Sequence, residues 1–350
     1  MNTVHVTASK SYDVHIGAGL LKDLGAYVTQ VKKVKKVCIV SEDTVWSLFG
    51  ETAKASLLDT GFEVIEFVFR SGEQFKNAAV YLELLYFMAE NQITRTDLIV
   101  ALGGGVVGDL AGFAAATYMR GIPFIQVPTT LLAAVDSSVG GKTAIDLPVG
   151  KNLVGAFYQP AMVLCDTECL KTLPEDIFRD GCAEVIKYGV LYDPELFAHL
   201  VQTGLDFDRE KVVTRCVELK RDVVAEDEFD TGARMRLNLG HTIGHGVEAC
   251  SHFTVSHGKG VATGMAIVAR AGEKYGICDA ATKDAIVNLL EKFCLPVSCA
   301  YSAAELYQVA LSDKKRSGGT VNLIIPERIG YCRIAPTPVE EVQTFIEAGL

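Results

Sequence analysis

The segment Leu98-Ile-Val-Ala-Leu-Gly-Gly-Gly-Val-Val-Gly-Asp109 decides the fold of the first half of the chain. Its first five residues are apolar and predict a buried strand, and the glycines after them predict a tight turn into a helix. Gly103 to Gly108 contains the pattern G-x-G-x-x-G, whose backbone N–H groups can approach a phosphate at a helix N-terminus. A tight strand-to-helix turn that binds no ligand is the simpler alternative.

The glycine segment differs from an ordinary dinucleotide-binding motif in two ways. It does not follow the first strand of its domain, and the next acidic residue after Asp109 is Asp136, which is too far along the chain to hold a ribose in the usual manner. We therefore expect the pyrophosphate of a dinucleotide, bound in a variant α/β arrangement.

Short β-branched runs alternate with helical patterns around this segment, up to about residue 170. The expected strands are Val37–Val40, Val64–Phe69, Leu98–Leu102 and Phe124–Val127. The expected helices between or after them are Ala53–Thr60, Ala78–Asn91 and Leu110–Met119. Alternation of this kind predicts βαβ units and a mostly parallel sheet.

The pattern changes to helices from about residue 175. The expected helices are Asp176–Tyr188, Pro194–Thr203, Asp208–Ala225, His241–Cys250, Gly260–Tyr275, Ala281–Phe293 and Ala303–Ser312, followed by a hairpin of Thr320–Pro326 and Gly330–Ile334. The sequence thus predicts two domains: a Rossmann-like α/β nucleotide-binding domain over residues 1–174 and an all-helical domain over residues 175–350.

Composition excludes several classes of protein. The net charge of −10 argues against a nucleic-acid binder. The first residues lack the apolar core of a signal peptide, and Arg120 and two prolines interrupt the most apolar stretch, Leu110–Val135, so we expect no membrane segment. The ten cysteines form no CxxC pair and indicate reduced, mostly buried thiols of a cytoplasmic protein.

Four of the seven histidines lie within the seventeen residues His241–His257. His241 and His245 are four residues apart, so a helix would put both imidazoles on one face, and a divalent metal is the first hypothesis. The alternative is a helix with two solvated or core histidines. Glu184 lies among apolar neighbours, three residues before Lys187. Together with two histidines it would complete a catalytic zinc site, although Glu184 and Lys187 could also form a surface ion pair.

Other polar segments suggest ligand contacts. Lysines beside glycines in Asp136–Lys142 and Gly150–Asn152 suggest phosphate binding. Ser71–Lys76 and Ser41–Asp43 each follow a strand and precede a helix, where a carboxylate can hold ribose hydroxyls or simply cap the helix.

Taken together, these motifs resemble the 3-dehydroquinate synthase family of sugar-phosphate cyclases over nearly the whole chain. The resemblance is carried by Ser71–Lys76, Gly103–Asp109, Thr129-Thr130, Asp136–Asp146, Gly150–Asn152, Gly181–Gly189, Lys220, Arg234–His245, His257-Gly258 and Asp313-Lys314-Lys315. It implies an N-terminal domain that binds NAD and a helical C-terminal domain that binds a metal.

The resemblance also implies roles for individual residues. Glu184, His241 and His257 would bind Zn²⁺ or Co²⁺, so His245 would belong to the substrate site rather than pair with His241 on the metal. The implied catalytic residues are Asp136, Lys142, Lys187, Asn238 and His245. The implied substrate-binding residues are Arg120, Lys142, Lys151, Asn152, Lys187, Lys220, Arg234, Asn238, His245 and Lys314. The implied NAD-binding residues are Asp43, Ser71, Gly72, Glu73, Gln74, Phe75, Lys76, Gly105, Val106, Val107, Gly108, Asp109, Thr129, Thr130, Lys142, Lys151, Cys169, Leu170, Lys171 and Thr172.

The implied reaction converts 3-deoxy-D-arabino-heptulosonate 7-phosphate to 3-dehydroquinate and phosphate, a step of the shikimate pathway of aromatic amino acid biosynthesis. It would proceed by transient oxidation with NAD, phosphate elimination, reduction, ring opening and aldol closure, which makes the enzyme a lyase. Arg120 matches a residue that reaches the neighbouring subunit, so a homodimer is implied. One departure is Lys259-Gly260, where the family usually has Glu-Ala after the histidine and glycine; another is a His241–His257 spacing one residue shorter than in some members.

Three alternatives remain open on the sequence. Another sugar-phosphate cyclase would act on a substrate without a carboxylate and would not need both Lys220 and Arg234. A metal-dependent polyol dehydrogenase would release NADH and would not need so many lysines for phosphate. A non-catalytic nucleotide-binding protein would not need the three implied metal ligands.

Overall fold

The computed structural model describes residues 1–31, 33–314 and 319–350, apart from the side chains of residues 310–314. The chain divides into two compact units, which we describe separately. The first unit contains Met1–Leu173 and Arg209–Phe229, and the second unit contains Pro174–Asp208 and Asp230–Leu350.

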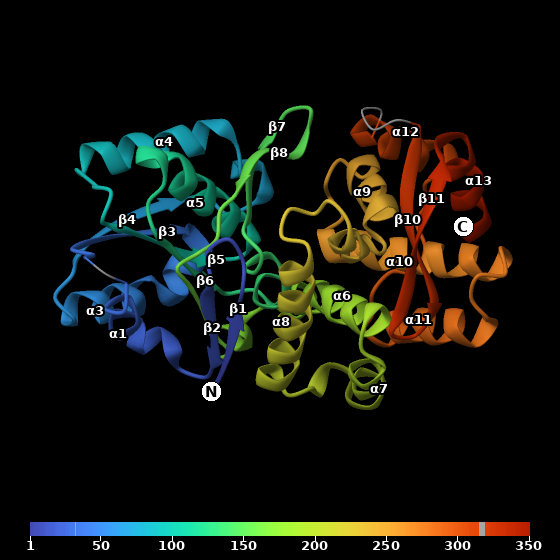
Figure 1. The fold of residues 1–350 in the computed structure, drawn as a ribbon, viewed down its shortest axis with the longest axis horizontal. Helices are drawn as coiled ribbons and strands as arrows, with labels where there is room; N and C mark the ends of the chain where they lie inside the picture. The colour runs from blue at the N-terminus through green and yellow to red at the C-terminus, as the bar shows by residue number, and fades with distance from the viewer. Residues whose placement is uncertain (32, 315–318) are drawn as a thin grey trace. The chain divides into compact units, whose positions relative to one another are not determined.

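A seven-stranded sheet forms the centre of the first unit, with the strand order β1-β2-β9-β6-β5-β3-β4 (Figure 1). Its strands are β1 (Asn2–Val6), β2 (Tyr12–Gly17), β3 (Lys36–Glu42), β4 (Glu63–Phe69), β5 (Leu98–Gly103), β6 (Phe124–Pro128) and β9 (Met162–Asp166). Every pairing is parallel except that of β1 with β2. The prediction of a mostly parallel sheet is confirmed, and β1, β2 and β9 are additional to the four predicted strands.

Helices cover both faces of this sheet. They are α1 (Leu24–Val28), α2 (Asp43–Val45), α3 (Glu51–Asp59), α4 (Ala78–Glu90) and α5 (Gly105–Thr117). Cys38 and Val40 of β3 pack with α4 and α5, whereas Val37 and Ile39 pack with α1 and α3. Because alternate residues of a strand point to opposite faces, the continuous apolar run of β3 supplies two cores at once.

Helix α8 (Arg209–Glu226) corrects the predicted domain division. The prediction assigned residues 175–350 to the second domain, but α8 packs on β1 and η5 (Ala133–Ser137) and belongs to the first unit. An amphipathic pattern shows that a helix has a buried face, but it does not show which element covers that face. The first unit also contains the hairpin of β7 (Lys142–Leu147) and β8 (Gly150–Phe157).

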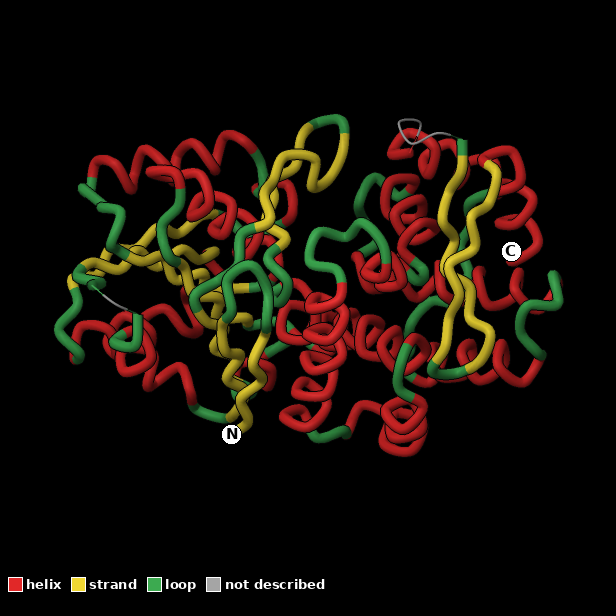
Figure 2. The backbone as a smooth tube through the Cα atoms, in the orientation of Figure 1, coloured by secondary structure: helices red, strands yellow, loops and turns green. Residues whose placement is uncertain are grey.

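The second unit is a helical bundle with one hairpin (Figure 2). Its helices are α6 (Glu175–Leu191), α7 (Pro194–Thr203), α9 (His241–Cys250), α10 (His257–Lys274), α11 (Ala280–Lys292), α12 (Ala303–Lys314) and α13 (Val339–Gly349). The hairpin consists of β10 (Thr320–Arg328) and β11 (Tyr331–Pro338). α10 lies at the centre and contacts α6, α9, α11 and α13, which explains why most of its residues are buried.

Two helices begin three or more residues earlier than predicted. α5 begins at Gly105 rather than Leu110, because glycines in its first turn weaken the helical pattern although the chain is helical there. It ends at Thr117, because Met119 and Arg120 adopt left-handed conformations with φ of 50° and 69°. α10 begins at His257 rather than Gly260, and β11 continues to Pro338 rather than Ile334.

Glycines allow α9 and α10 to approach each other closely. A Cβ atom on Gly264 would lie 2.0 Å from the carbonyl oxygen of Gly240, and one on Gly244 would lie 2.8 Å from the backbone of Gly260. Only hydrogen fits at these positions, so the glycines set the distance between the helix that carries His241 and the helix that carries His257.

We therefore expect Gly264→Ala to lower the free energy of unfolding by about 1–3 kcal/mol, as is typical when a packed contact is overfilled. Gly246→Ala on α9 is a suitable control, because its Cβ would lie 3.2 Å from its nearest neighbour and small shifts can accommodate it. Urea denaturation of both variants measures the difference. Equal stability of the two variants would show that the Gly264 contact can relax.

The remaining composition-based expectations can be compared with the structure. All ten cysteines are free thiols, and most of them are buried, as predicted. None of the helices among the described residues is both long and apolar enough to cross a membrane.

Candidate active site

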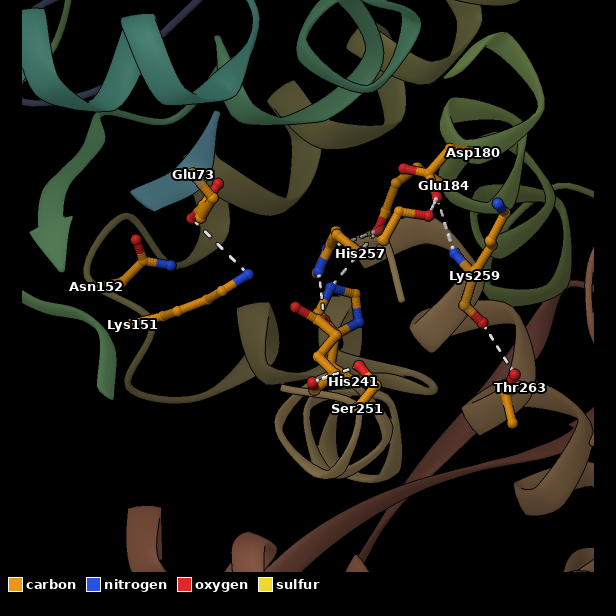
Figure 3. Close-up of polar contacts among 12 residues, drawn as sticks. Glu73, Lys151, Asn152, Asp180, Glu184, His241, Ser251, His257, Lys259 and Thr263 are labelled. Atoms are coloured by element: carbon orange, nitrogen blue, oxygen red, sulfur yellow. Dashed lines mark hydrogen bonds and ion pairs between the residues drawn. The ribbon is translucent and has the colours of Figure 1, made fainter. Parts of the chain in front are cut away.

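Three helices of the second unit bring Glu184, His241 and His257 together (Figure 3). Oε1 of Glu184 lies 3.5 Å from Nε2 of His241 and 3.4 Å from Nε2 of His257. One carboxylate oxygen and two imidazole nitrogens lie within 4.8 Å of one another, and two nitrogens with one oxygen is a donor set found in catalytic zinc sites. The residues therefore fit a divalent metal.

The carboxylate of Glu184 is completely buried, and a neighbouring cation compensates its negative charge. Lys187, which is also buried, forms an ion pair with it one turn along α6. Among the described residues, neither oxygen of Glu184 has a hydrogen-bond partner of ordinary geometry. A buried carboxylate usually has a metal or a cation as its partner, which makes Glu184 a suitable ligand.

The two histidines of this set differ in their electrostatics. Burial lowers the pKa of His241 well below its ordinary value, and the charge of Lys187 lowers it further, which favours the neutral form that binds metals. Burial also lowers the pKa of His257, but the carboxylates of Glu184 and Glu248 outweigh burial and raise it to about 10. The two carboxylates therefore favour the protonated form of His257.

His245 lies beside these residues but belongs to a different donor set. Its ring centroid is 5.5 Å from that of His241, and the second possible donor set consists of His245, Glu248 and His257. His241 and His245 do not share a donor set among the described residues, so the structure does not support the metal pair suggested by their spacing. Helical spacing puts two side chains on one face, but it does not show where the third ligand lies.

Glu248 and Asp180 are two residues that the sequence analysis did not assign. Oε1 of Glu248 lies 2.9 Å from Nδ1 of His257. Asp180 accepts a hydrogen bond from the backbone N–H of Lys259 at 2.9 Å and one from the hydroxyl of Ser256, so it caps the N-terminus of α10. Spacing places Glu248 on the face of His241, seven residues along α9, and Asp180 on the face of Glu184, four residues before it on α6, but it does not show their contacts with α10.

The glycine segment of the first unit lies between buried β5 and the start of α5, as predicted. No side chain caps the N-terminus of α5 among the described residues, and Gly104 and Gly105 are partly exposed there. A Cβ on Gly104 would lie 3.0 Å from Cγ2 of Thr130. An uncapped helix N-terminus with backbone that can be closely approached fits a phosphate group.

Several predicted NAD-binding residues surround Lys76, which is almost completely buried. Its Nζ lies 2.9 Å from Glu73, 3.2 Å from Asp109 and 3.7 Å from Asp146. Burial lowers the pKa of Lys76, but these carboxylates outweigh burial and raise it above the ordinary value. Burial raises the pKa of Asp109 to about 6, although Lys76 opposes that shift.

Two predicted substrate-binding residues of the β7–β8 hairpin also contact this cluster. Lys76 donates a hydrogen bond to the side-chain oxygen of Asn152 at 2.7 Å, and Lys151 lies 3.8 Å from Glu73 (Figure 3). Lys76 and Glu73 are both residues expected to contact the NAD, and the backbone N–H of Asn152 also donates to Asp146 at 2.7 Å. Lys142 is exposed at the start of β7.

Near the end of β3, Glu42 rather than Asp43 caps the following helix, with its carboxylate accepting from the N–H groups of Thr44 and Val45. Asp43 instead accepts a hydrogen bond from the N–H of Ser71 at 3.1 Å. Asp43 also accepts from the N–H of Thr44 at 2.9 Å, so its carboxylate both contacts the start of the helix and joins two segments that were expected to contact NAD.

The other predicted residues take up varied positions. Lys220 of α8 is buried, forms an ion pair with Asp136 and donates to the Asp136 carbonyl at 2.6 Å. Arg120 is exposed in a strained turn of the first unit.

Arg234 is almost completely buried in η8 (Ala233–Asn238), which ends at Asn238. The Cys169–Thr172 segment forms a single 3₁₀ turn after β9. Lys314 is the last residue of α12, and its side chain lies outside the described residues.

Comparison with known proteins gives consistent matches. The family model described as 3-dehydroquinate synthase N-terminal matches residues 66–180, and the one described as 3-dehydroquinate synthase C-terminal matches residues 181–316. The 3-dehydroquinate synthase of Enterococcus faecalis is 44% identical over 348 residues, which cover 97% of each chain.

Two solved structures of related enzymes share the fold. A 2-deoxy-scyllo-inosose synthase, complexed with carbaglucose-6-phosphate, NAD⁺ and Co²⁺, has a TM-score of 0.89 and 25% identity over 100% of both chains. The 2-epi-5-epi-valiolone synthase of Streptomyces hygroscopicus subsp. jinggangensis, with NAD⁺ and Zn²⁺ bound, has a TM-score of 0.87 and 26% identity, covering 99% of this chain and 97% of its own. Both are sugar-phosphate cyclases, as the predicted fold class requires. With matches to both halves of the chain and to a full-length relative, this protein belongs to the 3-dehydroquinate synthase family.

Proposed function

We propose that this enzyme is a 3-dehydroquinate synthase, which converts 3-deoxy-D-arabino-heptulosonate 7-phosphate to 3-dehydroquinate and phosphate. The observation that carries the proposal is the buried cluster of Glu184, His241 and His257 beside Lys187, in a chain that belongs to this family. The enzyme would be a phosphate-eliminating lyase, because NAD is restored at the end of each turnover.

The donor set and the glycine segment fit the two groups that this reaction requires. A Zn²⁺ or Co²⁺ held by Glu184, His241 and His257 would supply a Lewis acid that makes substrate hydroxyls more acidic. NAD held at the N-terminus of α5 would supply a reversible hydride acceptor. The structures of two related cyclases with NAD⁺ and with Co²⁺ or Zn²⁺ support both assignments.

The protein side chains would hold the substrate and move protons. His245 is exposed beside the proposed metal ligands, and histidine is the residue most often used as a general acid or base. Lys142, Asn238, His245 and Lys314 would bind the phosphate, where the lysines provide positive charge. Lys187 would keep a positive charge beside Glu184, which lowers the cost of burying that carboxylate. Asp136 is proposed as a further catalytic residue, and Lys151 and Asn152 are proposed as further substrate-binding residues.

The substrate carboxylate separates this function from those of other sugar-phosphate cyclases. Arg234 presents a planar guanidinium that can bind a carboxylate through two parallel hydrogen bonds. Lys220 would provide the second cation after exchanging its ion pair with Asp136 for one with the substrate. A cyclase for a sugar phosphate without a carboxylate would have no use for this pair.

An assay with the heptulosonate phosphate, Zn²⁺ or Co²⁺ and a substoichiometric amount of NAD tests the proposal. We expect many equivalents of phosphate per NAD and no steady increase in absorbance at the NADH band, since each hydride is returned. NADH accumulation in step with turnover would indicate a dehydrogenase. Turnover of a carboxylate-free sugar phosphate, without turnover of the heptulosonate, would indicate a different cyclase.

We also propose a homodimer in which Arg120 reaches the neighbouring subunit, and a cytoplasmic location. The exposure of Arg120 supports the first proposal, and the ten free cysteines support the second, because reduced thiols persist in the cytoplasm.

A further inference from the structure

His257 belongs to two possible donor sets at once. Its Nε2 faces Glu184 at 3.4 Å, and its Nδ1 lies 2.9 Å from Oε1 of Glu248. The first set contains Glu184 and His241, whereas the second contains Glu248 and His245. The role of Glu248 therefore decides which nitrogen of His257 binds a metal, and how many metals the site holds.

The surroundings of Glu248 favour a fixed hydrogen bond over metal binding. The Glu248 side chain is almost completely buried, whereas His245 of the same donor set is exposed. Its carboxylate lies between α9 and α10 at the point where glycines bring these helices together. A Cβ on Gly260 would lie 3.1 Å from Cγ and 3.4 Å from Oε1 of Glu248, so the carboxylate packs directly over this glycine.

The backbone of His257 is held as firmly as its ring. Asp180 caps α10 through the N–H of Lys259, and a Cβ on Gly258 would lie 1.9 Å from the carbonyl oxygen of Asp180 (Figure 3). These contacts hold the N-terminus of α10 against α6. The His257 side chain can then move mainly by rotation of its ring. A hydrogen bond from Nδ1 to a buried carboxylate removes that freedom and leaves Nε2 directed at Glu184 and His241.

We infer that Glu248 is the positioning residue of the metal site: it accepts the Nδ1 proton of His257 and thereby selects Nε2 as the ligand atom. This inference rests on the metal site of the proposed function. It makes Glu184, His241 and His257 the complete set of protein ligands, and it predicts one metal ion per chain. The usual effect of removing such a carboxylate is a 10- to 100-fold loss of metal affinity.

The test compares Zn²⁺ affinity, measured by competition with a fluorescent chelator, in the full-length wild type and in three variants. We expect Glu248→Ala to bind Zn²⁺ about 10- to 100-fold more weakly, and Glu248→Gln to recover most of the loss, because an amide oxygen still accepts the Nδ1 proton. Val247→Ala is the matched control: it truncates the buried neighbouring residue on α9 and should lower stability without changing affinity.

A second measurement reports on the ring itself. In zinc-loaded protein labelled with ¹⁵N-histidine, the Nδ1–H signal of His257 should be present in the wild type and in Glu248→Gln, and altered or lost in Glu248→Ala. Unchanged affinity and an unchanged signal in folded Glu248→Ala would overturn the inference. So would two Zn²⁺ ions per wild-type chain, with Glu248→Ala binding one. A wild type that binds no metal would instead contradict the proposed function, because the site itself would be absent.

Discussion

His241→Ala is expected to leave the protein without bound metal after dialysis and to lower kcat by about a thousandfold or more. In the proposed site His241 supplies one of three ligands, and two ligands hold a divalent ion far less tightly than three. Lewis-acid stabilisation of a developing charge contributes several kcal/mol, and about 4 kcal/mol corresponds to a thousandfold. Elemental analysis gives the metal content, and phosphate release from the heptulosonate phosphate gives the rate.

His245→Ala is the matched control, since it removes an imidazole from the same face of α9. We expect this variant to keep one equivalent of metal and still lose about 10²- to 10⁴-fold in rate, the usual contribution of a positioned acid or base. The two variants should thus separate metal content from activity. A His245→Ala protein without metal would show that the ligand assignment is wrong. Glu184→Ala is a poorer test, because it leaves the Lys187 cation buried without its partner.

Lys76→Met is expected to lower the free energy of unfolding of the first unit by about 3–5 kcal/mol, the usual cost of removing one partner from a buried ionic group. The methionine fills a similar volume, but Glu73, Asp109 and Asp146 lose the cation that they share. Denaturation in guanidinium chloride at pH 7, followed by circular dichroism, measures the change.

The pH dependence provides an internal check on this second prediction. The pKa of Asp109 is about 6, so lowering the pH through this range protonates it and removes its need for a cation. The stability difference between Lys76→Met and the wild type should therefore shrink as the pH falls. Lys54→Ala is the control, because its ion pair with Glu66 is partly exposed to solvent and its loss should change the denaturation midpoint little. A similar change of the denaturation midpoint in both variants would mean that the Lys76 cluster contributes no more to stability than the Lys54 ion pair.

The sequence predicts those parts of the fold that have a clear local signal. β3 to β6 and the helices α3, α4 and α5 follow from apolar runs and helical periodicity, and α7 and α9 have the predicted ends. The start of α10 depends on Asp180, which is distant in the chain, so no local pattern could place it. The attachment of α8 to the first unit likewise depends on what its apolar face contacts.

The candidate site shows the same limit. Spacing alone paired His241 with His245, whereas the resemblance to a family selected Glu184 and His257, which the structure brings to His241. Glu248 is visible in the sequence as one more carboxylate on α9, but its function depends on the ring of His257, which belongs to another helix. Contacts between distant segments therefore carry the information that the sequence pattern lacks.

The ion pair between Glu184 and Lys187 affects how the protein can acquire its metal. Many small zinc domains stay unfolded until the ion arrives, because nothing else compensates their ligands. Here a lysine forms an ion pair with the buried carboxylate, and the three proposed ligands lie on α10 and on α6 and α9, which pack against it. We therefore expect folding and metal loading to be separable events: a newly made chain would fold without its ion, and the supply of divalent cations would then influence which ion occupies the site.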